Sequence, residues 1–243
     1  MTMDAHEQRR YRRAPVPVHF PTFAEMPESK RHLESRTTLY QILKLAFADR
    51  ACIGCDQFVY WDPTDPKACL APDAFVRLGA KDELFASWKV WERGAPHLAV
   101  EVVSIHDSRD EVWERKFDKY RRLGVRELVL FDLEAHAAPL RVWDAVDGDL
   151  VERELILPRR TQCGPLELSW VVVDDEELGL SLRLADSATG AFLPTPAEAE
   201  RERAEAERER AEAERERARA ERERGEIRIR ALEEELARLK ASG

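Results

Sequence analysis

In the first half of the chain, segments with the hydrophobic spacing of a helix alternate with segments typical of β-strands. Apolar side chains recur at helical spacing over Glu28–Asp49, which predicts a long first helix. Short strands are expected at Gln57–Trp61 and Ala74–Leu78, and a proline-containing turn lies next to each of them. Apolar residues run almost without a break through His97–Val103, which is typical of a strand buried on both faces.

The second half of the chain changes from mixed helix and strand to strands alone. A helix is expected at Asp107–Leu123, because Gly124 follows directly and suits the position after a helix end. A strand at Glu127–Asp132 comes next, and Asp147-Gly148 is a hairpin-turn signal. Further strands are expected at Leu140–Trp143, Leu150–Leu157, Leu168–Val173 and Leu180–Leu184. This order of elements predicts one α/β domain over residues 25–190, with a central mixed β-sheet flanked by helices.

The segments on either side of this domain differ from it in composition. Prolines exclude a long helix near the start, so residues 1–24 are expected to form an irregular N-terminal arm. Residues 197–243 are rich in Glu, Arg and Ala and repeat the heptad Ala-Glu-Ala-Glu-Arg-Glu-Arg. Because Glu and Arg fall three and four residues apart, this segment is predicted to be a long charged helix.

Pairing of the predicted C-terminal helix with another helix depends on its seam, the positions three and four residues apart that lie along one side. Up to residue 224 the seam positions hold only Ala and Arg, whereas a stable coiled coil needs larger apolar residues there. An apolar seam is formed only by Ile229, Leu232, Leu236 and Leu239. Two interpretations remain open: an isolated charged helix that only solubilises the protein, or a helix whose tip forms a homodimer.

Composition and charge restrict the classes of function. The chain has 243 residues, of which 36% are charged, and a formal net charge of −9. An acidic protein is poorly suited to charge-driven, non-specific binding of nucleic acid, although a local basic groove can still hold DNA. No stretch has the roughly 18 apolar residues of a membrane span and the first residues are polar, so a cytoplasmic protein is expected. Cys52-x-x-Cys55 has no matching second pair among the four cysteines, so neither a zinc site nor a disulfide framework is expected.

One acidic side chain lies inside the predicted buried strand His97–Val103. Glu101 is flanked by Val100 and Val102, and a carboxylate in a buried strand is costly unless it is paired or binds a cation. Asp73 follows Pro72 at the point where another strand begins. Two carboxylates that converge from adjacent strands form a hard oxygen site, which suits Mg²⁺ or Mn²⁺.

A lysine would complete such a site, because its charge can position water or stabilise a phosphoryl group. The second residue after Glu101 is Val103, so the lysine must come from elsewhere in the chain. Lys116 on the predicted helix can reach back to the site, and Lys119 is the alternative. Tyr120 lies on the same helix face as Lys116, which makes it a further candidate site residue.

Each of these residues also has a purely structural interpretation. Glu101 could pair with an arginine, Asp73 could cap a turn, and Lys116 could be a solvated lysine. His106 and Asp107 follow the strand directly, but such an Asp usually caps a helix. The tryptophans are expected in the core rather than on a base-stacking surface; they are Trp88, Trp91, Trp113 and Trp143.

Taken in chain order, these residues resemble a known family. The motifs are Pro72-Asp73, Val100-Glu-Val-Val-Ser104, Lys116-x-x-x-Tyr120-x-x-x-Gly124-Val125-x-Glu127 and Phe131-Asp132. At these spacings they resemble the Uma-two family of restriction endonucleases, which belongs to the PD-(D/E)xK nuclease superfamily. The resemblance covers residues 25–185 and is strongest over 72–132. It departs at Ser104-Ile-His106, where the family commonly has Ser-Pro-Ser.

The resemblance implies a restriction-endonuclease-like core that hydrolyses DNA phosphodiester bonds with a divalent metal, Mg²⁺ or Mn²⁺. By this resemblance Asp73 and Glu101 become metal ligands. Lys116 becomes the catalytic lysine, moved from the strand onto the following helix. Glu28 or His32 matches a polar position at the start of the first helix that often faces the site.

Two functions from different classes remain open. The first is a divalent-metal-dependent endonuclease that acts on DNA. The second is a catalytically inactive nuclease-fold scaffold or binding protein that acts through its helical tail. The intact set of Asp, Glu and Lys favours the first function, and the acidic body favours the second to a smaller degree. A homodimer through the core or through the C-terminal helix is compatible with either function.

Overall fold

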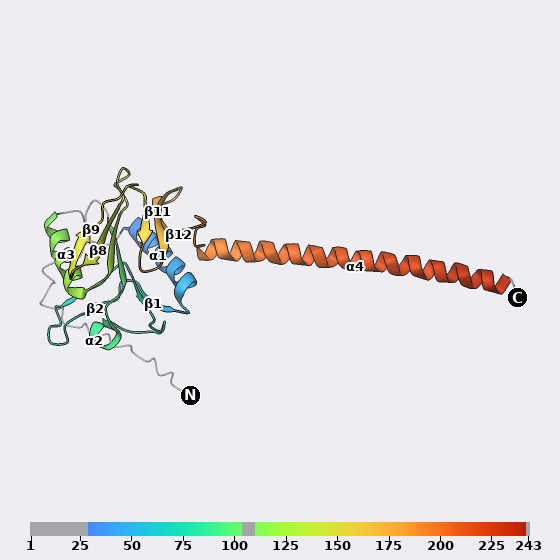
Figure 1. Cartoon of the computed structure of the whole chain (residues 1–243), viewed down its shortest axis with the longest axis horizontal. Coiled ribbons are helices and arrows are strands. Elements are labelled where there is room, and N and C mark those ends of the chain that lie inside the picture. Colours follow the sequence, from blue (N-terminus) through green and yellow to red (C-terminus); the bar gives the residue numbers. More distant parts are fainter. Residues whose placement is uncertain (1–28, 104–109, 242–243) are drawn as a thin grey trace, which may run out of the picture.

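The computed structural model describes residues 29–103 and 110–241, which form an α/β body and one long projecting helix (Figure 1). The centre of the body is a six-stranded sheet with the order β1-β4-β6-β7-β8-β9. Its strands are β1 (Ala51–Gly54), β4 (Ala74–Leu78), β6 (Leu98–Val103), β7 (Glu127–Asp132), β8 (Leu140–Val146) and β9 (Asp149–Glu152). Helices α1 (Lys30–Phe47) and α3 (Asp110–Leu123) pack on opposite faces of this sheet. The predicted fold class, a central mixed sheet flanked by helices, is therefore confirmed.

The sheet is mixed because only its central pair of strands is parallel. β6 and β7 run parallel from the pair Leu98↔Glu127 to the pair Val103↔Asp132, and the other neighbours in this sheet are antiparallel. A parallel pair needs a crossover connection, and α3 lies in that connection. All six residues of β6 are buried, which agrees with the nearly continuous apolar run in its sequence.

One face of the sheet is covered by α1 together with a second, three-stranded sheet. That sheet has the order β10-β11-β12, with β10 (Arg160–Cys163), β11 (Leu168–Asp175) and β12 (Gly179–Asp186). Leu43 of α1 and Trp170 of β11 are fully buried in one cluster with Val100 of β6. Burial of each side chain of this size stabilises the fold by about 1.5–3 kcal/mol.

The other face is covered by α3 and a small sheet of three two-residue strands. The small sheet has the order β3-β2-β5, with β3 (Cys69–Leu70), β2 (Val59–Tyr60) and β5 (Trp88–Lys89), and the short helix α2 (Val90–Arg93) follows it. Trp88 packs here beside Tyr120 of α3. Of the four tryptophans expected in the core, Trp88 and Trp143 are buried and Trp113 is half-buried against this cluster. Trp91 is 45% exposed, so the expectation was wrong for this residue.

Several predicted boundaries differ from the structure. The first helix begins at Lys30, because the side chain of Ser29 caps it by accepting a hydrogen bond from the backbone N–H of His32 at 3.1 Å. The predicted strand Leu150–Leu157 was too long, since β9 ends at Glu152. The side chain of the next residue, Arg153, enters a buried polar network. Of Gln57–Trp61, only Val59–Tyr60 is a strand.

Two strands of the larger sheets were not predicted. β1 is short, contains a glycine and shows no polar alternation, while β10 has the polar sequence Arg-Thr-Gln-Cys. Gly54 of β1 is required by packing, because a Cβ atom there would overlap the ring of Phe75. Gly124 follows α3 with φ 79°, which confirms the predicted helix end. Residues Asp147 and Gly148 both have positive φ, as the predicted hairpin turn requires.

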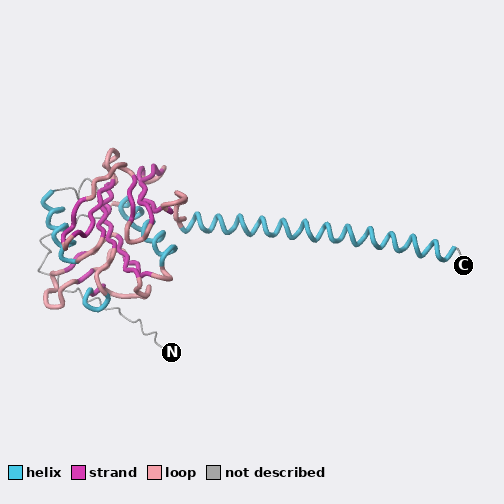
Figure 2. The backbone as a smooth tube through the Cα atoms, in the orientation of Figure 1, coloured by secondary structure: helices cyan, strands magenta, loops and turns pink. Residues whose placement is uncertain are grey.

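The C-terminal segment forms one continuous helix, α4 (Pro196–Ala241), which extends away from the body (Figures 1 and 2). Its start is a capping box: the backbone N–H of Glu198 donates to Thr195 Oγ1 at 3.2 Å, and the Thr195 N–H donates to Glu198 Oε2 at 2.7 Å. Arg183 of β12 also donates to Glu198 Oε2 at 2.7 Å and fixes the first turn to the body. Within residues 29–103 and 110–241, no helix is both long and apolar enough to cross a membrane.

Candidate active site

The centre of the candidate site is a carboxylate inside the sheet. Glu101 is only 1% exposed and lies on the face of β6 that is covered by α3. Lys116 Nζ donates to Glu101 Oε2 at 2.6 Å, and the hydroxyl of Tyr120 donates to Glu101 Oε1. Both carboxylate oxygens therefore have a donor, which satisfies the requirement that a buried charge be paired.

Helix α3 supplies both donors because they are one turn apart. Lys116 and Tyr120 have the i, i+4 spacing that places side chains on one helix face, as predicted. The Tyr120 ring is fully buried, whereas the Lys116 side chain is 37% exposed. Lys119 lies elsewhere, because its Nζ donates to the backbone carbonyl of Cys69 at 3.1 Å. The structure thus brings Lys116, and not Lys119, to Glu101.

Asp73 reaches the same place from the neighbouring strand. It directly precedes β4, whose first residue Ala74 pairs with Val100, so Asp73 stands opposite Glu101 at the end of the antiparallel ladder. The side chain is 7% exposed, and Asp73 Oδ2 accepts a hydrogen bond from the backbone N–H of Val102 at 2.8 Å. The two candidate carboxylates therefore converge from adjacent strands, as the sequence predicts.

His32 joins the site from α1. Its Nε2 atom is 3.3 Å from Asp73 Oδ2 and 2.6 Å from the backbone carbonyl oxygen of Val102. His32 thereby contacts both Asp73, which directly precedes β4, and Val102, near the end of β6. The other candidate on this helix, Glu28, lies outside the described residues, as do His106 and Asp107.

Burial and neighbouring charge give the two carboxyls different proton affinities. Burial, with a smaller contribution from the negative charge of Asp73, raises the pKa of Glu101 to about 7 despite the opposing charge of Lys116. Burial also raises the pKa of Asp73, but the hydrogen bond and charge of His32 outweigh this effect, so the pKa is below its ordinary value. Burial and the adjacent Glu101 raise the pKa of Tyr120 well above 10, so this hydroxyl remains a donor.

The donor set fits a hard divalent cation. Among the described residues, no three His, Cys, Asp or Glu side chains are grouped so that they could hold a metal ion. Mg²⁺, however, is commonly held by one or two carboxylates, with water and substrate phosphate completing its octahedron. Asp73 and Glu101 are two buried, adjacent carboxylates whose charges oppose each other, and a divalent cation would offset that repulsion.

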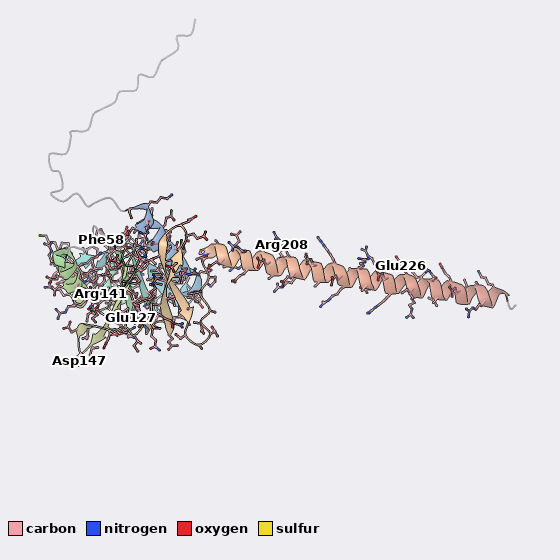
Figure 3. All side chains as sticks on the ribbon, turned by 90° about the horizontal axis from the view of Figure 1, so that it is seen from above. Phe58, Glu127, Arg141, Asp147, Arg208 and Glu226 are labelled. Carbon is pink, nitrogen blue, oxygen red and sulfur yellow. The ribbon has the colours of Figure 1, made fainter. Side chains whose placement is uncertain are left out.

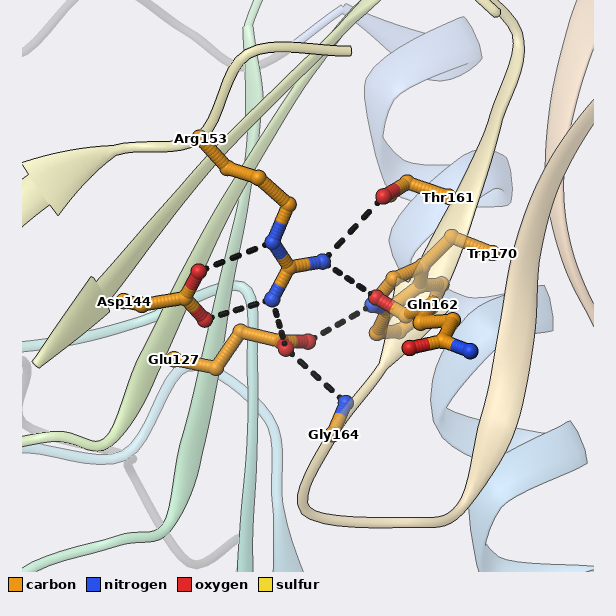
Figure 4. A network of polar contacts seen from close by, with 7 residues as sticks. All are labelled: Glu127, Asp144, Arg153, Thr161, Gln162, Gly164 and Trp170. Atoms are coloured by element: carbon orange, nitrogen blue, oxygen red, sulfur yellow. Dashed lines mark hydrogen bonds and ion pairs between the residues drawn. The ribbon is translucent and has the colours of Figure 1, made fainter. Parts of the chain in front are cut away.

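A second buried glutamate has a different environment. Glu127 is also 1% exposed, but it lies on the face of the sheet that holds α1 and the second sheet. Glu127 Oε2 accepts from Arg153 Nη2 at 2.9 Å and from the Gly164 N–H at 3.0 Å, while Oε1 accepts from Trp170 Nε1 at 2.9 Å (Figure 4). Arg153 in turn pairs with Asp144 on β8. This network ties the central sheet to β10 and β11 and leaves no carboxylate oxygen of Glu127 without a partner.

Comparison with known proteins identifies the family of this chain. The family model of Uma2, described as "Putative restriction endonuclease", matches residues 22–181. The chain belongs to the Uma2 family, and the resemblance inferred from the motifs is confirmed. Among solved structures, the crystal structure of a putative nuclease belonging to DUF820 from Anabaena variabilis matches with 12% sequence identity and a TM-score of 0.40. That match covers 54% of this chain and 70% of the other. None of the curated proteins compared with the chain matches it.

Proposed function

We propose that the protein is a divalent-metal-dependent endonuclease that hydrolyses phosphodiester bonds in DNA. The observation that carries the proposal is the convergence of Asp73, Glu101 and Lys116, which come from three different elements and meet at one end of the central sheet. Membership in the Uma2 family supports the same class of activity and DNA as the substrate.

The five residues of the site have three roles. Asp73 and Glu101 would hold Mg²⁺ or Mn²⁺, and the bound ion would activate water and offset negative charge on the phosphoryl group. Lys116 is half-exposed and can turn its ammonium group from Glu101 toward the phosphate or the attacking water. Tyr120 and His32 are positioning residues, because they fix Glu101 and Asp73 through hydrogen bonds.

The proposal is tested by nicking of supercoiled plasmid DNA with the purified full-length chain in Mg²⁺, in Mn²⁺ and in EDTA. We expect cleavage with either ion and none in EDTA. We expect Asp73→Asn, Glu101→Gln and Lys116→Met each to lower the rate by about a hundredfold or more. Lys119→Met is the matched control: it removes the same charge from the same helix one turn away and should leave the rate unchanged.

Calorimetric titration of Mn²⁺ into the same proteins separates binding from chemistry. Asp73→Asn and Glu101→Gln should lose the ion, whereas Lys116→Met should keep it. Cleavage that persists in Glu101→Gln and Lys116→Met would place the activity outside this site. Mn²⁺ binding without any cleavage in the wild type would favour the inactive scaffold instead.

A further inference from the structure

Helix α4 leaves most of its surface in solvent. After the first turn, which Arg183 holds to the body, nearly all described side chains up to Lys240 are exposed. Figure 3 shows this part of the helix standing clear of the body, with Arg208 and Glu226 directed away from the helix axis. The repeated part is charged all round, so it gains no stability from an apolar face.

The distal part of α4 differs from the repeat because it carries apolar side chains in water. Ile229, Leu232 and Leu236 are 59%, 55% and 54% exposed. Their spacing of three and four residues places them along one side of the helix, and we call these three residues the distal stripe. Ile227 is 69% exposed but lies outside this spacing. Contiguous exposed apolar side chains of this kind mark an interaction surface.

We propose that the distal stripe pairs with the same stripe of a second copy of this chain, as a short parallel two-stranded coiled coil. The order of residues fits that arrangement. Ile229 occupies an a position, Leu232 the following d position and Leu236 the next a position. In parallel coiled coils, a β-branched residue at a, such as Ile229, with leucine at d favours two strands.

Charge complementarity supports the parallel orientation. With Ile229 at position a, Arg228 is at position g and Glu233 is at the e position that faces it in the second copy. The parallel dimer therefore contains two Arg–Glu pairs between the copies. An antiparallel dimer that keeps Leu232 and Leu236 in register would instead place the two copies of Glu233 side by side.

Charge at the g and e positions also indicates that the pairing ends just before the distal stripe. One heptad closer to the body, Glu221 would face Glu226 of the second copy, and Gly225 and Arg222 replace the apolar seam residues. Arg208 and Arg215 continue the charged seam toward the body. The repeat therefore remains a single helix that acts as a spacer between the body and the paired tips. Its length from Pro196 to Ile229 is about 50 Å at 1.5 Å per residue.

A parallel dimer would determine how the two active sites meet DNA, and this consequence rests on the proposed function. It holds both bodies at the same end of the paired tips, so that two active sites can reach one DNA molecule. An antiparallel dimer would hold the bodies at opposite ends. The pairing itself is measured without any nuclease assay, so its failure is distinguishable from failure of the proposed function.

The experiment measures the mass of the full-length chain by sedimentation equilibrium over a range of concentrations. We expect a monomer–dimer equilibrium whose upper limit is twice the chain mass of 28.0 kDa. Leu232→Glu with Leu236→Glu should give the monomer at all concentrations. Ile227→Glu, which adds the same charge beside the stripe, should leave the equilibrium unchanged. Circular dichroism of each variant checks that α4 remains helical.

Two further variants test the orientation. Arg228→Glu should raise the dimer dissociation constant by about fivefold, and adding Glu233→Arg should restore it. Ile229→Cys, at an a position inside the distal stripe, should form an intermolecular disulfide under mild oxidation, because only the parallel dimer brings the two copies of residue 229 together; the wild type is the control for native cysteines. A monomer at every concentration, or a dimer that survives the double leucine variant, would overturn the proposal. A dimer of the Ile229→Cys variant that does not cross-link would overturn the parallel arrangement.

Discussion

Replacement of Glu101 by glutamine should stabilise the protein at high pH when no metal is present. In the unfolded chain the carboxyl of Glu101 has a pKa near 4.5, and burial raises the pKa in the folded state to about 7. Because the folded state binds this proton more tightly, its stabilising effect is complete below pH 4.5 and is lost as the pH rises through 7. At about 1.4 kcal/mol per pKa unit, the loss is about 3 kcal/mol. Glutamine has no proton to lose and still accepts from Tyr120.

The assay is urea unfolding in EDTA, followed by tryptophan fluorescence, at pH 5 and at pH 8. Glu101→Gln should be more stable than the wild type by up to about 3 kcal/mol at pH 8, and this gain should shrink to near zero at pH 5. Added Mg²⁺ should stabilise the wild type and not the variant, since only the wild type keeps both carboxylates.

Glu127→Gln is the matched control, because it makes the same change at an equally buried glutamate. Its amide nitrogen would have to replace one carboxylate oxygen, although every partner of Glu127 is a donor. We expect a loss of about 3 kcal/mol at both pH values, because Arg153 loses a buried partner. If Glu101→Gln also destabilised the protein at pH 8, the free energy gained from the ion pair with Lys116 would be larger than the desolvation cost of the buried carboxylate. The reasoning would then be wrong.

Three smaller predictions concern other parts of the fold. Burial and two nearby arginines lower the pKa of His97 to about 4, so the stabilising contribution of this neutral side chain should be lost as the pH falls from 6.5 to 4, against the opposite change from Glu101. His97→Gln should lack that loss in urea unfolding at pH 4.5 and 7.5. Gly54→Ala should lower stability by about 1–3 kcal/mol in calorimetry, because its Cβ atom would overlap the Phe75 ring. Glu198→Ala removes the capping box and should speed hydrogen exchange in the first turn of α4 by about fivefold; an unchanged rate would show that the body alone holds this turn.

The central elements were predictable because burial and backbone geometry act locally on them. The nearly continuous apolar run of β6 is typical of a strand covered on both faces. Gly124 identified the end of α3 because a residue with positive φ is required there. Strands β1 and β10 could not be predicted, because each is four residues long and is selected by the strand beside it rather than by its own sequence.

The candidate site was also predictable from the sequence only in part. The cost of a carboxylate in a buried strand indicated Glu101, and the helical spacing placed Lys116 and Tyr120 on one face. The contact of His32 with Asp73 depends on how α1 crosses the end of β4, which no local pattern encodes. The choice between Lys116 and Lys119 was likewise settled by packing, since Lys119 bonds to the small sheet.

Glu101 and Glu127 show why a buried charge alone does not identify an active site. Both lie in the central parallel pair of strands, both are 1% exposed, and both were part of the family motifs. Glu127 has three donors of fixed geometry, two of them backbone or indole N–H groups that cannot move away. Glu101 has a second carboxylate nearby, and its strongest donor is a flexible lysine that reaches solvent. Lys116 can turn away from Glu101 when a cation or substrate binds, whereas the backbone and indole donors of Glu127 stay in place and support the fold. This difference between the partners, and not the burial, supports our proposal that Glu101 rather than Glu127 binds the metal.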